Sequence, residues 1–441
     1  MKKLVIGVVT ALVVAGCGPA QPGGGGGGAG GSGGAGGSGG AGGSGGAGGA
    51  GGSGGSGGGT GGAGGGASSG WTAMPLLDEQ VGGTTNFHDG DDRIVSIVYE
   101  SLDRGLIATA HDQRSSEGML FRASAKHVDA LLMTGAAMNN ADFINLFKTQ
   151  AGYVATLDTS TEVVISTDNG ATFAKVTTGL DYGGSHTVTL HDAPDGKWTW
   201  VGTSGVIAEA SSAPSASTAW TELWAPEGIP PTPNPVPATG CQLAPRTGFV
   251  PIPEQFVYVS PDRQLIAYTE NQDPPQLCLS HDGGRSFAAK DLVVNETHAS
   301  PIGPTGVTFI NATTGFVFGG DFLEGGSAYI QKTTNGGDTW APTVLPARLA
   351  TTPVQIRHVF FAPDGTHGWA VGWFESPSAP MLLATSDSGA TWTETAGEAD
   401  LKAKLGAVFG TKLYTGFALD AQHLWVGGER GTVFASDTGG N

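Results

Sequence analysis

Six acidic residues recur at one position, a few residues after a short apolar stretch that is typical of the second strand of a repeated unit. They are Asp112, Asp158, Asp273, Asp321, Glu375 and Glu429. Carboxylates gathered at one rim of a structure could bind cations or a basic segment of a partner. Two carboxylates at a suitable separation could instead serve as the acid and base of a glycosidase. Solvated turns are the alternative interpretation, and they require no ligand.

Motifs for metals and cofactors are missing from the sequence outside its Gly-rich segment. It has no H-E-x-x-H, no C-x-x-C and no phosphate-binding loop. His186 and His191 are five residues apart, and we interpret them as ordinary polar residues. The acidic turn His88-Asp-Gly-Asp-Asp92 lacks the carboxylate spacing of an EF-hand loop. We therefore expect no metal and no cofactor, and we assign no catalytic residue.

One eight-residue pattern, here called the octet, recurs along the chain. Its first copy is Ser166-Thr-Asp168-Asn-Gly170-Ala-Thr172-Phe173. Further copies begin at Ser280, Thr333 and Thr385, and the chain ends within a fifth that begins at Ser436. We assign its acidic or amide position to Asp168, Asp282, Asn335, Asp387 and Asp437. From Asp282 onward these positions are 53, 52 and 50 residues apart.

The octet is typical of a tight turn. An Asp or Asn side chain can accept hydrogen bonds from backbone N–H groups a few residues ahead. The Gly can take the left-handed conformation that other residues avoid, and the final aromatic residue can pack between sheets. We therefore expect the octet carboxylates to be structural rather than catalytic.

Short apolar stretches flank each octet and end in Gly, Asn or Asp, which is typical of strands. Two sets of seven such stretches predict seven units of about 53 residues over residues 71–441. Only Asp142–Lys148 and Glu398–Lys404 have a helical pattern. The prediction is an all-β fold, a single seven-bladed β-propeller of four-stranded blades. A solenoid is the alternative, although it needs polar caps at both ends.

The two ends of the folded region match each other. The last octet lacks its aromatic residue, and Ser69-Gly70-Trp71-Thr72 resembles the segment Ala390–Thr393. We expect the strand from Trp71 to about Leu77 to complete the last blade, which would close the ring and remove its exposed edges.

The N-terminus has the features of an export signal. Met1-Lys2-Lys3 is cationic, and Leu4–Ala15 is a 12-residue apolar stretch followed by Gly16 and Cys17. Residues 1–16 are the expected signal peptide. Residues 17–70 are the expected lipidated Cys17 and a disordered Gly/Ser/Ala-rich linker, because 34 of the 53 residues from Gly18 to Gly70 are Gly. No apolar stretch reaches the ~20 residues of a membrane-spanning helix.

Charge and cysteine content limit the partners. All 39 Asp and Glu residues follow residue 70, together with 19 of the 21 Lys and Arg residues, so this region has a net charge of −20. Such a surface disfavours nucleic acid. In an exported protein Cys241 and Cys278 are candidates for a disulfide, and two reduced, separately packed thiols are the alternative.

Three family resemblances follow from these motifs. Val14-Ala15-Gly16-Cys17 resembles the bacterial lipobox, which implies acylation of Cys17, palmitate included, and a lipid anchor in the cell envelope, in the outer membrane by analogy. The octets resemble the Asp-box (BNR) repeat of bacterial neuraminidases. The longer units, such as His367–Gly372 with Leu383–Trp392, resemble the repeats of photosystem II stability/assembly factor-like proteins.

These resemblances imply the function only in outline. We expect a monomeric envelope lipoprotein whose propeller is a non-catalytic binding or scaffold module for a protein or glycan partner. A glycoside hydrolase, sialidase-like or of another Asp-box type, is the alternative. The neuraminidase pattern is poorly matched. Arg93-Ile94-Val95 lacks the expected Pro, nothing supports a nucleophile at Tyr99-Glu100, and the members of the arginine triad cannot be assigned.

Overall fold

A computed structural model describes most of the region after residue 69. The described residues are 70–74, 92–111, 118–134, 141–150, 152–157, 162–180, 187–192, 195–202, 206–224, 255–258, 266–270, 276–292, 304–320, 328–375, 377–406, 412–429, 431 and 433–441. All of them belong to one compact unit. The predicted signal peptide, Cys17 and the linker lie outside the described residues.

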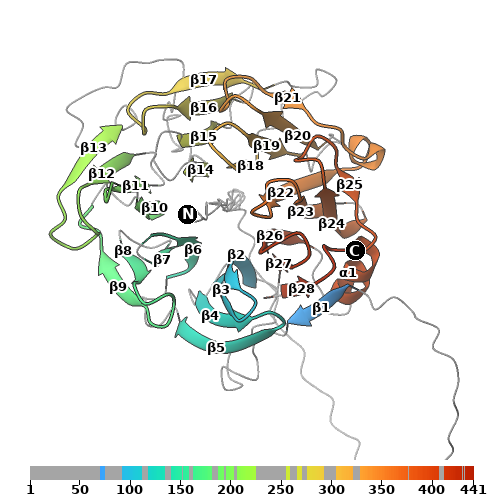
Figure 1. Ribbon diagram of the computed structural model, residues 1–441, viewed down its shortest axis with the longest axis horizontal. Helices are drawn as coiled ribbons and strands as arrows, with labels where there is room; N and C mark the ends of the chain where they lie inside the picture. The colour runs from blue at the N-terminus through green and yellow to red at the C-terminus, as the bar shows by residue number, and fades with distance from the viewer. Residues whose placement is uncertain are drawn as a thin grey trace, which may run out of the picture. The chain divides into compact units, whose positions relative to one another are not determined.

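Backbone hydrogen bonds join the described strands into seven antiparallel four-stranded sheets (Figure 1). The first three sheets are β2 (Asp92–Ser101), β3 (Arg104–His111), β4 (Met119–Ser124) and β5 (His127–Thr134); β6 (Phe143–Lys148), β7 (Tyr153–Leu157), β8 (Glu162–Ser166) and β9 (Ala174–Thr177); and β10 (Thr187–Asp192), β11 (Trp198–Gly202), β12 (Ile207–Ala210) and β13 (Trp220–Trp224). The next two are β14 (Gln255–Tyr258), β15 (Ile266–Glu270), β16 (Gln276–Ser280) and β17 (Ala288–Asp291); and β18 (Gly306–Phe309), β19 (Gly315–Gly319), β20 (Tyr329–Thr333) and β21 (Ala341–Pro342). The last two are β22 (Val354–Phe361), β23 (Gly368–Glu375), β24 (Ser378–Thr385) and β25 (Thr393–Glu394); and β26 (Leu413–Ala418), β27 (Leu424–Gly428), β28 (Val433–Ser436) and β1 (Trp71–Met74).

Each sheet contacts the next through its inner strands, and β26 contacts β2, so the sheets stand around a common centre (Figure 1). Successive residues of each strand point to opposite faces of the sheet. The buried residues of neighbouring sheets pack against each other. Phe316, Phe361 and Trp392, for example, form one aromatic group between the sheets β18–β21 and β22–β25.

The expected count of seven equivalent blades needs correction. Described side chains form hydrophobic cores at six junctions between neighbouring sheets. The sheet β14–β17 has no described side chain in its two inner strands. Six sheets therefore have described side chains in their inner strands that pack into these cores. In β14–β17 the described packing comes from β16, whose Leu277 and Leu279 lie in the core shared with β18–β21. Among the described residues the packed blades are thus six rather than seven, because apolar stretches in a sequence predict strands, whereas a blade also requires inner-strand side chains that pack against the neighbouring sheets.

Closure by the N-terminal strand is confirmed. β1 pairs with β28 in antiparallel register, with Trp71 opposite Ser436 and Met74 opposite Val433. Trp71 is buried in the core between the sheets β22–β25 and β26–β1. A Cβ atom on Gly70 would lie 2.0 Å from the backbone oxygen of Asn441, so the two ends of the folded unit are in contact. The last octet is therefore completed by Gly70 and Trp71 from the other end.

One helix covers this junction. The α-helix α1 (Glu398–Gly406) contacts β24 and β1, and Leu401 is fully buried beside Trp71. The Lys404 ammonium donates to the backbone oxygen of Trp71 and pairs with Asp400 at 2.8 Å. The helical pattern of Glu398–Lys404 is thus confirmed. A 3-10 helix, η2 (Ala347–Ala350), precedes β22.

The predicted helix over Asp142–Lys148 is wrong, because Phe143–Lys148 forms the inner strand β6. Its pairing with β7 skips Ile144, so Ile144 is a β-bulge. A bulge interrupts the alternation of faces, and consecutive residues such as Phe143 and Ile144 are both buried. The resulting apolar spacing resembles that of a helix.

Candidate functional site at the rim of the ring

The complete octets share the same pattern of hydrogen bonds. In the first copy, the Ser166 hydroxyl donates to Asp168 at 2.8 Å and accepts from the Gly170 N–H at 2.8 Å. Asp168 also accepts from the N–H of Thr172 at 2.8 Å and from its hydroxyl at 2.5 Å. Asp282 and Asp387 have equivalent partners. The hydroxyl of Thr172, followed by the N–H groups, lowers the pKa of Asp168 to about 2.

The assignment of Asp437 as an octet carboxylate is wrong, because Asp437 lies one position before the carboxylate position of the last octet. The Ser436 hydroxyl accepts from the Gly440 N–H at 3.0 Å and from the Thr438 N–H at 3.2 Å, so Thr438 occupies the carboxylate position. Asp437 instead pairs with Lys126 of the neighbouring sheet at 2.8 Å. This ion pair links the last sheet to the neighbouring sheet β2–β5.

The octets and the rim acids lie at opposite ends of a sheet. In β22–β25, Glu375 at the end of β23 pairs with Ser378 at the start of β24, whereas the octet follows Thr385 at the end of β24. Among the six acids, Glu375 and Glu429 are described, and Asp112, Asp158, Asp273 and Asp321 lie outside the described residues. The ring of carboxylates therefore stays a prediction.

Inner strands share a structural feature near this rim. Five of them contain a register shift at an equivalent position, which leaves one bulged residue in each strand. The bulged residue is aliphatic in three strands, whereas it is Arg357 in β22 and Tyr414 in β26. Bulges commonly re-aim side chains beside functional sites, so the junction of β22 and β26 differs from the others.

Six residues at this junction form what we call the rim cluster: Arg357, Trp373, Glu375, Lys412, Tyr414 and Glu429. The Arg357 guanidinium lies 4.8 Å from the centre of the Trp373 ring, and the Lys412 ammonium lies 5.3 Å from it. The Tyr414 ring meets the Trp373 ring at 5.4 Å and 60°. Trp373 is 3% exposed, so it supports the two cations and does not itself face solvent.

Both described rim acids accept hydrogen bonds from side chains of the rim cluster. Glu375 accepts from the Trp373 indole N–H at 2.6 Å. Glu429 lies 3.5 Å from the Lys412 ammonium and accepts from the Tyr414 hydroxyl at 3.5 Å. The Lys412 side chain remains 36% exposed. The rim cluster therefore presents fixed charges of both signs on an aromatic base.

His358 lies beneath the rim cluster, directly after the bulge in β22. Its Nδ1 accepts from the Gly416 N–H of β26 at 3.0 Å, which joins the two bulged strands. Burial lowers the pKa of His358 to about 3. The imidazole is therefore neutral, which its role as acceptor requires.

The remaining candidates do not form a catalytic group in the described part of the chain. Tyr99 stacks on Trp425 at 3.7 Å and donates to the Ser124 backbone oxygen, and burial raises its pKa. Glu100 pairs with Arg104 at 2.9 Å and with Lys148. No group of three or more potential metal-binding side chains occurs among the described residues. Within those same residues, no helix has the length and apolarity to span a membrane.

Among the three cysteines, Cys278 lies within the described residues. Cys278 is fully buried in β16 and is disulfide-bonded. Cys241 lies outside the described residues, so its pairing with Cys278 stays a prediction. His186 and the side chain of His191 also lie outside the described part.

Comparison with solved structures identifies the fold. YCF48 from Cyanidioschyzon merolae has a TM-score of 0.54 and 16% sequence identity over 83% of this chain and 98% of its own. YCF48 bound to D1 peptide has a TM-score of 0.55 and 12% identity over 84% and 96% of the two chains. The folded unit is a β-propeller. The resemblance to photosystem II assembly factors is thereby confirmed at the level of fold.

Enzymes share this fold. The GH74 xyloglucanase from Xanthomonas campestris has a TM-score of 0.52 and 14% identity over 84% of this chain and 53% of its own. No family model matches the sequence, and no curated protein matches it either. At these identities the comparisons establish the architecture, and function has to be argued from the site.

Proposed function

We propose that this chain is a lipid-anchored envelope protein whose propeller is a non-catalytic binding module for a protein partner, which it contacts through the rim cluster. One observation carries the proposal. The bulged position is aliphatic in β2, β6 and β10 but is Arg357 and Tyr414 in β22 and β26. The inner strands β22 and β26 contact each other, and both depart from the pattern of the repeat. Their bulged positions have polar side chains where the other repeats have aliphatic ones.

The composition of the rim cluster supports binding rather than chemistry. Arg and Tyr are among the residue types that dominate protein–protein contacts, and the buried Trp373 supports Arg357 from beneath. Glu375 and Glu429 are already matched to donors within the cluster. The propeller of YCF48 bound to D1 peptide shows that a similar fold holds a peptide.

Site-specific photo-crosslinking in intact cells tests this function. A photoreactive residue replaces Lys412 in the full chain, and a matched chain has it at Val344, which is 63% exposed and remote from the rim cluster. We expect a discrete protein adduct from position 412 that is lost when Arg357→Ala is added, and none from position 344. Equal adducts at both positions, or none at 412, would contradict the proposal.

Glycoside hydrolysis is the second candidate, favoured by the likeness to the GH74 propeller. Its test is turnover of xyloglucan and of chromogenic glycosides, sialosides included, by the purified full chain. Turnover that disappears in Glu375→Gln or Glu429→Gln would replace binding with catalysis. We expect no turnover above that of a mock preparation.

A further inference from the structure

The octet that begins at Thr333 departs from the others in the residue before it. That position is apolar in the four other copies, where it is Ile165, Leu279, Ala384 or Ala435. Each of these packs against the core beside its sheet. Here the residue is Lys332, whose ammonium donates to the Ser388 backbone oxygen of the next sheet at 2.6 Å. One of its three N–H groups serves this contact, which leaves further donors.

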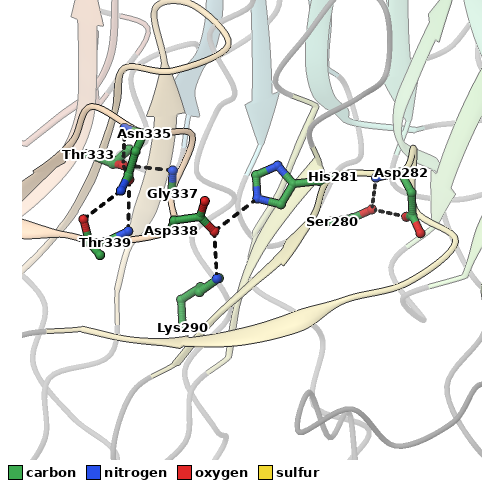
Figure 2. Close-up of polar contacts among 9 residues, drawn as sticks. All are labelled: Ser280, His281, Asp282, Lys290, Thr333, Asn335, Gly337, Asp338 and Thr339. Atoms are coloured by element: carbon green, nitrogen blue, oxygen red, sulfur yellow. Dashed lines mark hydrogen bonds and ion pairs between the residues drawn. The ribbon is translucent and has the colours of Figure 1, made fainter.

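The same octet has an amide where its complete relatives have a carboxylate. Asn335 accepts through Oδ1 from the Thr339 N–H at 3.0 Å, which fixes the orientation of the amide. Its Nδ2 therefore donates to the Thr339 hydroxyl oxygen at 3.0 Å (Figure 2). In the three complete copies that have Asp, the equivalent hydroxyl donates to the Asp, as Thr391 does to Asp387 at 2.6 Å. The reversed direction frees the hydroxyl proton of Thr339.

These two departures meet at one pocket. It has a volume of about 250 Å³ and is lined by Lys332, Thr334, Thr339, Ala341, Pro342, Thr343 and Ala390. Pockets for drug-sized ligands begin at about 300 Å³, so this one fits a compact group. Its lining combines an ammonium and a freed hydroxyl donor with small apolar surfaces, at the end of the sheet opposite the rim acids.

The neighbouring carboxylates are engaged elsewhere. Asp338 pairs with Lys290 at 2.9 Å and lies 3.6 Å from His281 (Figure 2). Asp387 accepts from the N–H groups of Ala390 and Thr391 and from the Thr391 hydroxyl. An anion in the pocket would therefore meet uncommitted donors at Lys332 and Thr339.

We propose that this pocket binds a compact oxyanion, a carboxylate or a phosphate group, through Lys332 and Thr339. Charge-assisted hydrogen bonds to such groups are the stronger ones in proteins. Asn335 is a positioning residue, since it determines which way the Thr339 hydroxyl points. The site is independent of the function proposed for the rim cluster.

The test uses the purified full chain with inorganic phosphate and acetate as separate probes, at constant ionic strength set with chloride. Isothermal titration and the thermal unfolding midpoint report binding. We expect saturable binding of at least one probe, and the probe that binds distinguishes a phosphate from a carboxylate source. Lys332→Met should weaken it at least tenfold, and Lys175→Met, a matched change in the distant sheet β6–β9, should leave it unchanged.

Asn335→Asp supplies an independent variant that retains the fold. Its carboxylate would accept a hydrogen bond from the Thr339 hydroxyl, as Asp387 does from Thr391, and would add a negative charge. We expect about tenfold weaker binding together with an unchanged or higher unfolding midpoint. Failure of both probes to saturate, or equal binding by Lys332→Met, would show that Lys332 is only a tie between sheets and would overturn the proposal.

Discussion

At the residue scale, each octet carboxylate stabilises its turn through hydrogen bonds that require ionisation. Asp387 accepts from the Thr391 hydroxyl and from two backbone N–H groups. These bonds, that of the Thr391 side chain first, lower the pKa of Asp387 to about 2. The carboxylate is exposed, so its contribution is modest.

We expect Asp387→Asn to lower the free energy of unfolding by about 1 kcal/mol at pH 7. The folded pKa lies below the unfolded value of about 3.9. The contribution is therefore complete above pH 4 and is lost as the pH falls toward 2. Urea titrations at pH 7 and pH 2.5 check this, and a difference between the two proteins that is the same at both pH values would contradict it.

The burial of His358 makes the free energy of unfolding depend on pH in a higher range. Its neutral imidazole accepts from Gly416 and its folded pKa is about 3, below the unfolded value of about 6.5. The unfolded chain therefore binds a proton at a pH where the folded chain does not. Stability from this residue is complete above pH 6.5 and falls by up to about 1.4 kcal/mol per pH unit on acidification toward pH 3.

The variant His358→Gln keeps an acceptor without a titration in this range. Between pH 6.5 and 4.5, wild type should lose about 2–3 kcal/mol more than His358→Gln. Chemical denaturation across this range measures the difference in slope, which is independent of any constant loss of stability in the variant. Parallel curves for the two proteins would contradict the assignment.

At the element scale, α1 secures the strand that closes the ring. β1 has four residues, and its backbone is held both by β28 and by Lys404 of α1. We expect Lys404→Ala to speed hydrogen exchange of the β1 amides about fivefold to tenfold, as the loss of about 1 kcal/mol of hydrogen bonding implies. Lys402→Ala, an exposed position of the same helix, is the control. Faster exchange in β28 as well would indicate global rather than local opening.

The element scale also shows where sequence patterns mislead. The apolar residues of β6 have helical spacing because the bulge at Ile144 places neighbours on the buried side. Bulges depend on pairing with β7, which a local pattern does not contain. Equivalent bulges in β22 and β26 re-aim Arg357 and Tyr414. The local sequence pattern does not reveal these bulges, and it therefore did not predict the rim cluster. A comparison of the repeats, with Arg and Tyr at a position otherwise occupied by Val or Ile, is the signal that could have found it.

At the scale of the whole molecule, the proposed anchor is tested through Cys17. Cys17→Ser should abolish incorporation of an alkyne-labelled palmitate and move the protein from the membrane fraction to the soluble fraction, because acyl chains supply the membrane affinity. Fluorescence gels and fractionation measure both results. Lys2→Gln, which leaves the lipidation site intact, should retain the label. Label that persists in Cys17→Ser would contradict the assignment.

Turn chemistry and alternating apolar residues are local properties. The repeat, the strands that flank each octet and the pairing of the two ends of the folded region could therefore be predicted from the sequence. The sequence pattern assigned Asp437 to the carboxylate position of the last octet, whereas the hydrogen bonds to the Ser436 hydroxyl put Thr438 there. The tertiary structure was needed to show which side chains pack between sheets, which carboxylates have partners, and that Trp373 supports Arg357 and Lys412. These depend on contacts between sheets that are distant along the chain, and no local pattern encodes such contacts.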